Sequence, residues 1–385
     1  MSHHPLSKTS RPLLPVVVTT PPQLATLLEA LSGQSAVAVD TESNSLYAYQ
    51  EQVCLIQISI PDADYIVDPL AGLDPSPLAR FFADPGVQKV FHAAEYDVMC
   101  LKRNFGFRFA SLFDTMWAAR ILGWPHVGLG DVLKETFGVR TNKRYQRYNW
   151  GKRPLELEAL AYACMDTHYL LPLCRLQADA LMQKGRWEEA QEVFDRLATS
   201  EPVSHTFAPE GFRRVKGAYD LTRREQAVLR ELYVWRDREA RRRDRPPFKV
   251  LNDHILVSLV QACPRTPYEL ADVSGLKPYH VRRYGRYILQ AIERGIRARP
   301  PKPPPPSLRH SEAEVTRFQA LRVWRKRVAA ERGVDADVVV SNAVLWALAE
   351  QNPRAFDDLS RIEGLGPWKR KTYGKAILKV LDTGC

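Results

Sequence analysis

The sequence predicts an α/β domain followed by two related all-helical domains. Strand-like and helical patterns are interleaved in the first half, a helical segment in the second half recurs at a fixed offset, and a proline-rich spacer separates its two copies. At roughly 100–200 residues per domain, a chain of 385 residues has room for this arrangement. The expected boundaries are 14–200 for the α/β domain, 213–297 for the first helical domain, 298–310 for the spacer and 311–385 for the second helical domain.

The α/β domain begins with a short apolar strand and an amphipathic helix within residues 16–32, and Gly33 ends that helix. From about residue 94 helical patterns take over. A long helix is expected to start at Pro154, which suits the first helical position because its missing N–H costs nothing there. Between these helical regions, runs of β-branched and apolar residues predict further strands at 36–39, 53–60, 64–68 and 88–91.

The second half of the chain contains an internal duplication. At an offset of 89 positions, and without a gap, tryptophan, proline and glycine positions coincide, among them Trp235 with Trp324, Pro264 with Pro353, and Gly285 with Gly374. Agreement of this kind indicates two copies of one helical unit.

The second copy contains a turn that suits a phosphate. Gly364 to Gly366 (GLG) precedes a basic helix start, which presents backbone N–H groups together with Lys369 and Arg370. We expect these two side chains to contact nucleic acid. The alternative is a helix-capping turn with solvated charges.

Composition excludes several classes of protein. No run approaches the ~18 apolar residues that span a bilayer, and the N-terminal residues do not resemble a signal peptide, so a cytoplasmic protein is expected. The six cysteines form no CxxC pair, which fits a reduced compartment and argues against a zinc site.

Charge is unevenly distributed along the chain. Residues 1–200 hold 19 basic and 22 acidic side chains, whereas residues 201–385 hold 36 basic and 22 acidic side chains. This distribution favours a polyanion partner, with a merely solvated surface as the alternative.

Four acidic residues are spaced as in a metal-dependent nuclease. Asp40 and Glu42 end a strand-like run, and residues i and i+2 of a strand point to the same face. Asp97 follows another strand at the start of a helix, and Asp166 lies one helical turn after Tyr162. Carboxylate ligands suit Mg²⁺ or Mn²⁺, and two such ions can stabilise the attacking and the leaving oxygen of a phosphoryl displacement.

Each of these residues has an expected role. Asp40 would bridge two divalent ions, Glu42 and Asp166 would bind the first ion, and Asp97 would hold the second. Tyr162 would position the attacking water.

These motifs resemble those of the DEDD superfamily of 3′→5′ exonucleases. The matching stretches are Asp40-Thr41-Glu42, His92-Ala93-Ala94-Glu95-Tyr96-Asp97 and Tyr162-x-x-x-Asp166, the last of which is typical of the tyrosine branch. Similarity to the ribonuclease D family extends to the His-Ala start of the second motif, to Phe113-Asp114-Thr115 and to Trp150-x-x-Arg153-Pro154-Leu155. The duplicated helical unit resembles the HRDC domain.

The resemblance implies a ribonuclease H-like mixed sheet, two divalent metal ions, and stepwise release of 5′-nucleotides from the 3′ ends of RNA. Precursor transfer RNA and other small structured RNAs are the usual substrates. The resemblance also implies that the backbone of Thr41 and Ser43 touches the 3′ hydroxyl and that Leu46 lies against the terminal base. It places His92 near a phosphate, with a buried, hydrogen-bonded histidine as the alternative. We expect no membrane and no obligate protein partner, and the oligomeric state stays open.

A stretch before the third motif interleaves basic and aromatic residues, a composition that can follow a single-stranded backbone and stack on its bases. We expect RNA contacts there from Lys143, Arg147, Trp150 and Arg153, with a solvated loop as the alternative. Asp114 could be a fifth metal ligand, but a cap for the following helix is the preferred interpretation.

Two other functions stay open at this point. One is a DNA 3′→5′ exonuclease of the proofreading or repair type, which shares the catalytic motifs. The other is a nucleic-acid-binding protein that has lost catalysis. The paired HRDC units favour RNA as the substrate, and none of the four carboxylate positions is broken.

Overall fold

A computed structural model describes residues 14–141, 144–202, 206–303 and 310–383. These residues form two compact units. One contains residues 14–43, 53–202 and 310–383, and the other contains residues 44–52 and 206–303.

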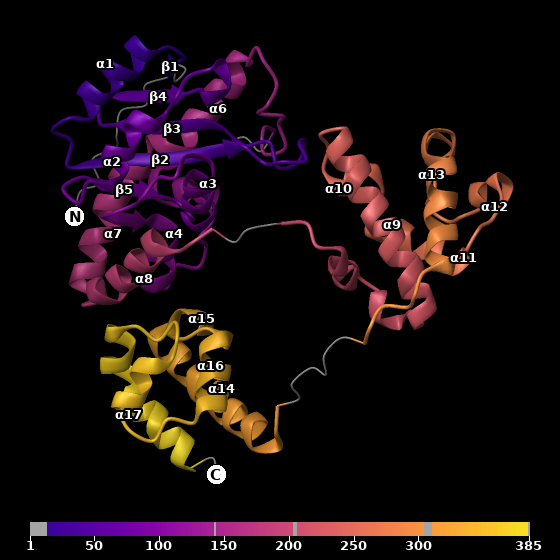
Figure 1. The fold of residues 1–385 in the computed structure, drawn as a ribbon. Helices are drawn as coiled ribbons and strands as arrows, with labels where there is room; N and C mark the ends of the chain where they lie inside the picture. The colour runs from indigo at the N-terminus through magenta and orange to yellow at the C-terminus, as the bar shows by residue number, and fades with distance from the viewer. Residues whose placement is uncertain (1–13, 142–143, 203–205, 304–309, 384–385) are drawn as a thin grey trace. The chain divides into compact units, whose positions relative to one another are not determined.

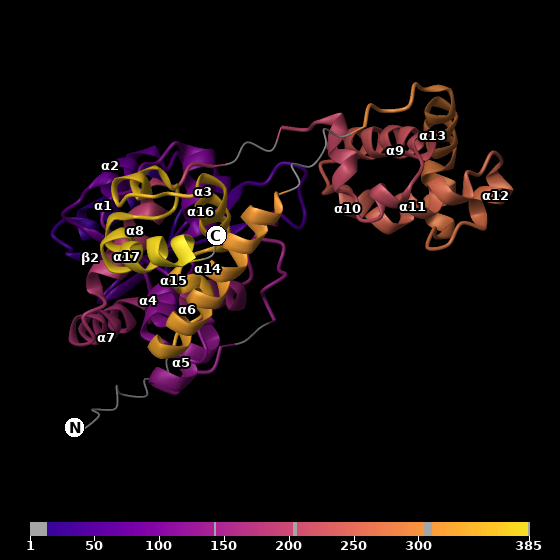
Figure 2. The ribbon, with the colours of Figure 1, turned by 90° about the horizontal axis from the view of Figure 1, so that it is seen from below.

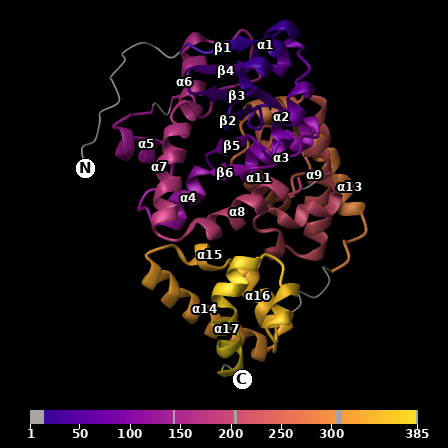
Figure 3. The same cartoon turned by 90° about the vertical axis from the view of Figure 1, so that its left-hand side faces the viewer.

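Six strands of the first unit form one sheet: β1 (Val16–Val18), β2 (Ala36–Ser43), β3 (Val53–Ile60), β4 (Ala63–Val67), β5 (Gln88–Phe91) and β6 (Leu112–Asp114). Their order across the sheet is β1-β4-β3-β2-β5-β6, as Figure 3 shows. β2 pairs antiparallel with β3 and parallel with β5, so both strand directions meet at the centre. The predicted α/β domain with a mixed sheet is confirmed.

Eight α-helices accompany this sheet within the described part of residues 14–202: α1 (Pro21–Leu31), α2 (Ala79–Ala83), α3 (Glu95–Phe105), α4 (Thr115–Leu122), α5 (Leu129–Phe137), α6 (Leu157–His168), α7 (Leu170–Gln183) and α8 (Trp187–Thr199). Figure 1 labels them except for α5, which is labelled in Figure 2. The side chains of β3 contribute to two cores. Ile56 and Ile58 join the main core, whereas Leu55 packs with Ala159 and Ala163 of α6. Helix α6 therefore covers one face of the sheet, and the other face carries the main core.

The long helix predicted from Pro154 is wrong in its start and its length. The backbone at Glu156 is extended (φ −73°, ψ 141°), so α6 begins at Leu157 and Pro154 precedes it. The chain then breaks into α6, α7 and α8, and Gly185 (φ 62°) lies at the second break. β6 has only three residues, too few to show the alternation that identifies a strand in the sequence.

The predicted duplication is confirmed by the helical domains. The first domain contains α9 (Arg223–Arg242), α10 (Pro247–Val250), α11 (Asp253–Ala262), α12 (Pro267–Ala271) and α13 (Pro278–Arg297). Counterparts of α9, α10, α11 and α13 begin 89 positions later as α14 (Glu312–Arg332), α15 (Ala336–Val339), α16 (Asn342–Gln351) and α17 (Pro367–Thr383). Each domain buries a tryptophan edge-on to a tyrosine at 5.7 Å between ring centroids, Trp235 on Tyr284 and Trp324 on Tyr373.

The second helical domain packs on the α/β domain within the first unit, where α17 lies beside α8 (Figure 2). Arg332 at the end of α14 forms an ion pair with the buried Glu189 of α8, with 2.5 Å between nitrogen and oxygen. Arg120 of α4 forms a second ion pair with Asp337 of α15 at 2.7 Å. Throughout the described ranges, every helix is too short or too polar to cross a lipid bilayer.

Candidate active site

Asp40 and Glu42 lie on the face of the sheet that α6 covers. In the β2–β3 ladder Asp40 is directly opposite Gln57 and Glu42 is directly opposite Leu55, and opposed residues of antiparallel strands share a face. Leu55 packs against α6. The strand alternation therefore sends both carboxylates towards the helix that carries Tyr162 and Asp166.

Asp97 reaches the site from the first turn of α3, where the sequence predicts it. Its side chain is 6% exposed and accepts a hydrogen bond from the Thr41 hydroxyl of β2. Asp114 stabilises the turn before α3, because its carboxylate accepts hydrogen bonds from the backbone N–H groups of Ala93 (3.2 Å) and Ala94 (2.7 Å). Asp114 also caps α4 as predicted, because it accepts from the backbone N–H groups of residues 116 and 117.

Burial raises the pKa of all four carboxyl groups. For Asp40 burial is the largest cause, followed by repulsion from Asp97, Asp166 and Glu42. Burial and then repulsion from Asp166 and Asp97 raise the pKa of Glu42 to about 9. The pKa of Asp166 rises to about 7 through burial and then repulsion from Asp97. Burial likewise raises the pKa of Asp97 to about 7, although the hydrogen bond from Thr41 lowers it. Asp40, Glu42, Asp97 and Asp166 therefore lie near one another, and without a cation their charged forms are unfavourable.

This donor set fits divalent cations in its chemistry. In the present side-chain arrangement, no three His, Cys, Asp or Glu residues of the described chain already enclose an ion. Buried carboxylates nevertheless need a positive charge, and hard oxygen donors suit Mg²⁺ and Mn²⁺. Next to Asp40, the Gln57 side chain is fully buried, and neither of its amide atoms has a hydrogen-bond partner among the described residues. A hydrated cation at this site would neutralise the carboxylates, and its water molecules could hydrogen-bond to the Gln57 amide.

An aromatic cluster supports Tyr162. The Trp150 ring lies nearly parallel to the Tyr162 ring, at 6.3 Å between centroids and 25° between planes, and Tyr145 contacts Tyr162 from another side at 5.7 Å. Burial, and then the nearby carboxylates, raise the pKa of the Tyr162 phenol above its ordinary value. Trp150 is only 2% exposed, so its ring has little surface left for RNA in this arrangement, and the contact that the sequence predicts stays a prediction. The ring packs against Tyr162 instead.

Arg153 also has a structural role in place of the predicted contact with RNA. Its Nε and Nη2 donate to the two carboxylate oxygens of Asp68 at 2.8 and 2.5 Å. The remaining N–H groups donate to the carbonyl oxygens of Trp150, Lys152 and Cys54. All the donors of the guanidinium are used within the protein, so none is left for a phosphate.

His92 adopts the second of its two predicted situations. It is partly buried, and its Nδ1 lies 2.9 Å from the Thr115 hydroxyl, which itself donates to the carbonyl oxygen of Phe91. Burial lowers the pKa of His92 to about 4. The imidazole is therefore neutral and acts as a hydrogen-bonding group of the fold.

The other predicted RNA contacts differ in placement. The Thr41 side chain is buried at Asp97, and the Ser43 hydroxyl lies 3.3 Å from that of Tyr96. Leu46 is 41% exposed and belongs to the segment 44–52 of the second compact unit. Arg147 is exposed, and Lys143 lies outside the described residues. The contacts expected of Thr41, Ser43, Leu46 and Arg147 stay predictions.

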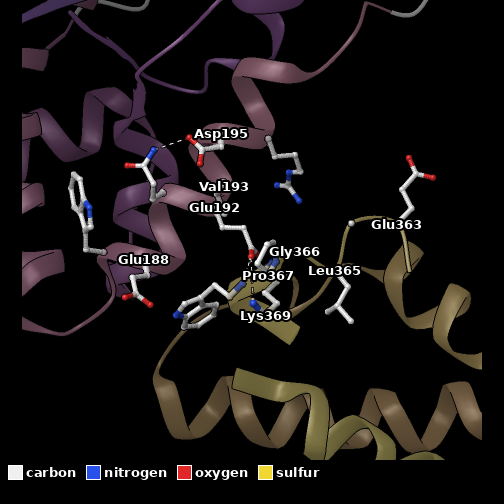
Figure 4. Close-up of a pocket in the computed structure, with 14 residues that line it drawn as sticks. Glu188, Glu192, Val193, Asp195, Glu363, Leu365, Gly366, Pro367 and Lys369 are labelled. Carbon is white, nitrogen blue, oxygen red and sulfur yellow. Dashed lines mark hydrogen bonds between the residues drawn. The ribbon is translucent and has the colours of Figure 1, made fainter. Parts of the chain in front are cut away.

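The glycine turn of the second helical domain holds a carboxylate of the protein itself. Glu192 of α8 accepts a hydrogen bond from the backbone N–H of Trp368 at 2.6 Å, and its carboxylate points at Gly366 (Figure 4). A β-carbon at Gly366 would lie 2.1 Å from Cδ of Glu192, so only glycine permits this approach. Lys369 is 4% exposed beside it, and Arg370 is half-buried. Glu192 therefore occupies the place at this turn where the predicted phosphate would bind, and the contacts expected of Lys369 and Arg370 stay predictions.

Three important residues are missing from the sequence-based set: Gln57, Asp68 and Glu192. Gln57 interrupts an apolar strand, which is a signal that could have been noticed. Asp68 and Glu192 lie far along the chain from Arg153 and Gly366, and their partners become evident only in three dimensions.

Known proteins resemble this chain over nearly its whole length. Residues 15–178 match a 3′-5′ exonuclease family, and residues 225–292 and 314–381 each match the HRDC domain. Ribonuclease D of Nitrobacter hamburgensis is 31% identical over 369 residues, which cover 94% of either chain. The crystal structure of Escherichia coli RNase D, an exoribonuclease involved in structured RNA processing, matches with a TM-score of 0.69 and 26% identity over 96% of this chain and 99% of that one. The catalytic core of RRP6 from Trypanosoma brucei matches with a TM-score of 0.68 and 29% identity, over 77% of this chain and 83% of that one.

Proposed function

Because this chain belongs to the ribonuclease D family, we propose that it is a 3′→5′ exoribonuclease that releases 5′-nucleotides by two-metal-ion hydrolysis. The observation that supports the proposal is the repulsion among Asp40, Glu42, Asp97 and Asp166, which indicates that the four side chains lie near one another. Burial raises the pKa of each of these carboxyl groups, and repulsion within the set raises the pKa of Asp40, Glu42 and Asp166 further. A site of this kind is costly for a protein that does not use it, because it stores unneutralised charge.

The four carboxylates are the groups that would hold the ions, Mg²⁺ or Mn²⁺. Asp40 would contact both ions, Glu42 and Asp166 the first, and Asp97 the second. Two bound divalent ions supply the charge that stabilises the attacking and the leaving oxygen of the phosphodiester. Thr41 keeps the Asp97 carboxylate in position through its hydrogen bond.

Tyr162 orients the attacking water. Because the pKa of its phenol is raised, the hydroxyl keeps its proton at neutral pH and serves as a hydrogen-bonding group rather than as a base. Trp150 and Tyr145 restrict the ring to one position through their packing. One turn along α6, Asp166 lies close enough to repel the phenolate form.

The substrates we propose are the 3′ ends of precursor transfer RNA and of other small structured RNAs in the cytoplasm. The net positive charge of the second half of the chain supports a polyanion substrate. Two of the matched proteins are named as a ribonuclease and as an exoribonuclease that processes structured RNA.

A gel time course tests the proposal. Wild-type protein and Asp40→Asn are incubated with 5′-labelled precursor transfer RNA that carries a 3′ tail, and with a DNA strand of the tail sequence, with Mg²⁺ or with a chelator. We expect a ladder of one-nucleotide steps only with RNA, Mg²⁺ and wild-type protein. Faster shortening of the DNA strand would indicate a DNA exonuclease, and intact RNA in every lane would exclude the proposed activity.

A further inference from the structure

A groove of about 730 Å³ opens on the first helical domain between α13 and the turn before α12. Val281, Gly285 and Leu289 of α13 line its apolar part. Three arginines, Arg265, Arg286 and Arg297, stand around it, and all three are exposed.

The second copy of the domain indicates what size of group this groove accepts. At the offset of 89 positions, Phe356 replaces Pro267 and Gly374 replaces Gly285. A β-carbon on Gly374 would lie 2.8 Å from Cε2 of Phe356, so the phenyl ring covers α17 at that point. A β-carbon on Gly285 would meet only Leu270 at 3.3 Å and Val281 at 3.8 Å. The first copy therefore leaves open a space that an aromatic ring fills in the second.

The charges around the two positions differ as well. In the second copy Arg354 forms an ion pair with Asp382 at 3.1 Å. Their counterparts by sequence are Arg265 and Glu293, but Glu293 pairs with Arg297 at 2.5 Å instead. An apolar space for one flat ring with guanidinium groups at its edge matches a nucleotide, because the base can pack on the apolar wall while its phosphate meets an arginine.

We propose that this groove binds one unpaired nucleotide of the RNA substrate. The base occupies the position that Phe356 takes in the second copy, and the adjacent phosphates contact Arg265 and Arg286. The proposal rests on the proposed function, since it assigns the groove to the RNA that the active site shortens. It gives the two HRDC domains different tasks: the first copy holds RNA, while the second packs on α8.

The test is the affinity of the full chain for a 5′-fluorescein-labelled single-stranded RNA of ten nucleotides, measured by fluorescence anisotropy at fixed salt. The Asp40→Asn chain is used so that the RNA stays intact. Pro267→Phe supplies the ring of the second copy and changes no charge, so it separates the groove from general electrostatics. We expect it to weaken binding by about tenfold, the loss for one stacked base. Arg286→Ala is expected to weaken binding more than Arg238→Ala, a control on the exposed side of α9.

Leu289→Phe narrows the same groove from α13. This variant is used in place of Pro267→Phe if thermal unfolding shows that Pro267→Phe does not fold. Unchanged affinity in a folded groove variant would overturn the inference. The proposed function is judged separately, by whether the chain with Asp40 intact shortens the RNA. Shortening together with unchanged affinity of Pro267→Phe rejects the groove alone, whereas failure to shorten RNA rejects the proposed function.

Discussion

The hydroxyl of Thr41 donates a hydrogen bond to the carboxylate of Asp97 and thereby joins the central strand β2 to the first turn of α3. Both side chains are buried, at 9% and 6% exposure, so solvent does not compete for this bond. A residue between two proposed metal ligands, Asp40 and Glu42, thus positions a third ligand from another element. The strand and the helix are tied together at the point where the chemistry is proposed to occur.

Thr41→Val should therefore lower kcat/KM for RNA by about tenfold, because a lost hydrogen bond to a buried carboxylate is worth about 1.5–3 kcal/mol in stability and only part of this acts in the transition state. Valine has the shape of threonine but cannot donate. Thr41→Ser keeps the hydroxyl and should retain most of the activity. Equal losses in the valine and serine variants would show that the methyl group, rather than the hydrogen bond, matters.

Without metal, the folded protein should become less stable as the pH rises. A carboxyl group whose pKa is raised in the folded state adds stability below its ordinary pKa and loses it as the pH rises through the folded value. For Asp166 this window extends from 3.8 to about 7. Within this window the group is protonated in the folded state and ionised in the unfolded state. Each pH unit of the window therefore changes the free energy of unfolding by about 1.4 kcal/mol.

Asp166→Asn isolates this effect, because asparagine carries no charge to repel Asp97. In a chelator at pH 8 its melting temperature should exceed that of wild type, and the difference should shrink towards pH 5. Addition of Mg²⁺ should stabilise wild type more than the variant. Parallel curves of melting temperature against pH for the two proteins would contradict this account.

Trp150→Ala should destabilise the protein by about 3–5 kcal/mol, because it leaves a large cavity beside Tyr162. Trp150→Phe keeps an aromatic contact and should fold, with a smaller loss of stability in urea. Its kcat should fall while its affinity for RNA changes little, since the buried ring touches Tyr162 rather than the substrate. A large loss of RNA affinity with kcat unchanged would restore Trp150 to the role that the sequence predicts.

Glu192→Ala should expose the start of α17. The Trp368 N–H has no partner within its own helix, so loss of the Glu192 carboxylate should speed its hydrogen exchange by about tenfold. Gly366→Ala should have the same effect, because the added β-carbon collides with Glu192. Glu188→Ala is the matched control, because it removes an exposed carboxylate from α8, the helix that carries Glu192. Slow exchange at Trp368 in both variants would mean that Glu192 does not hold this turn.

The sequence predicts those features that have a local cause. Asp40 and Glu42 share a face because strand side chains alternate, and Tyr162 and Asp166 share a face because a helix turns once in about four residues. The duplication is visible because buried Trp235 and Trp324 occupy equivalent positions at one offset.

Features that depend on distant partners are not predictable in this way. In the sequence Arg153 lies in a basic and aromatic stretch that is typical of RNA contacts. In the structure its guanidinium instead donates to Asp68, 85 positions away. Gly366 has the pattern of a phosphate-binding turn until Glu192 fills it. Trp150 lies among basic residues in the sequence, and its burial becomes evident only in the fold. In each case a group that is typical of an RNA contact has its partner inside the protein.

The most direct test of the central claim compares two acidic residues of one helical turn. Asp97 is buried at the site, whereas Glu95, two positions earlier on α3, is exposed. Asp97→Asn and Glu95→Gln each remove one negative charge with little change in shape, and both are assayed on 5′-labelled RNA with Mg²⁺. We expect the one-nucleotide ladder from the 3′ end to disappear in Asp97→Asn and to persist in Glu95→Gln. A ladder of normal rate from Asp97→Asn would contradict the claim that these four carboxylates form the active site.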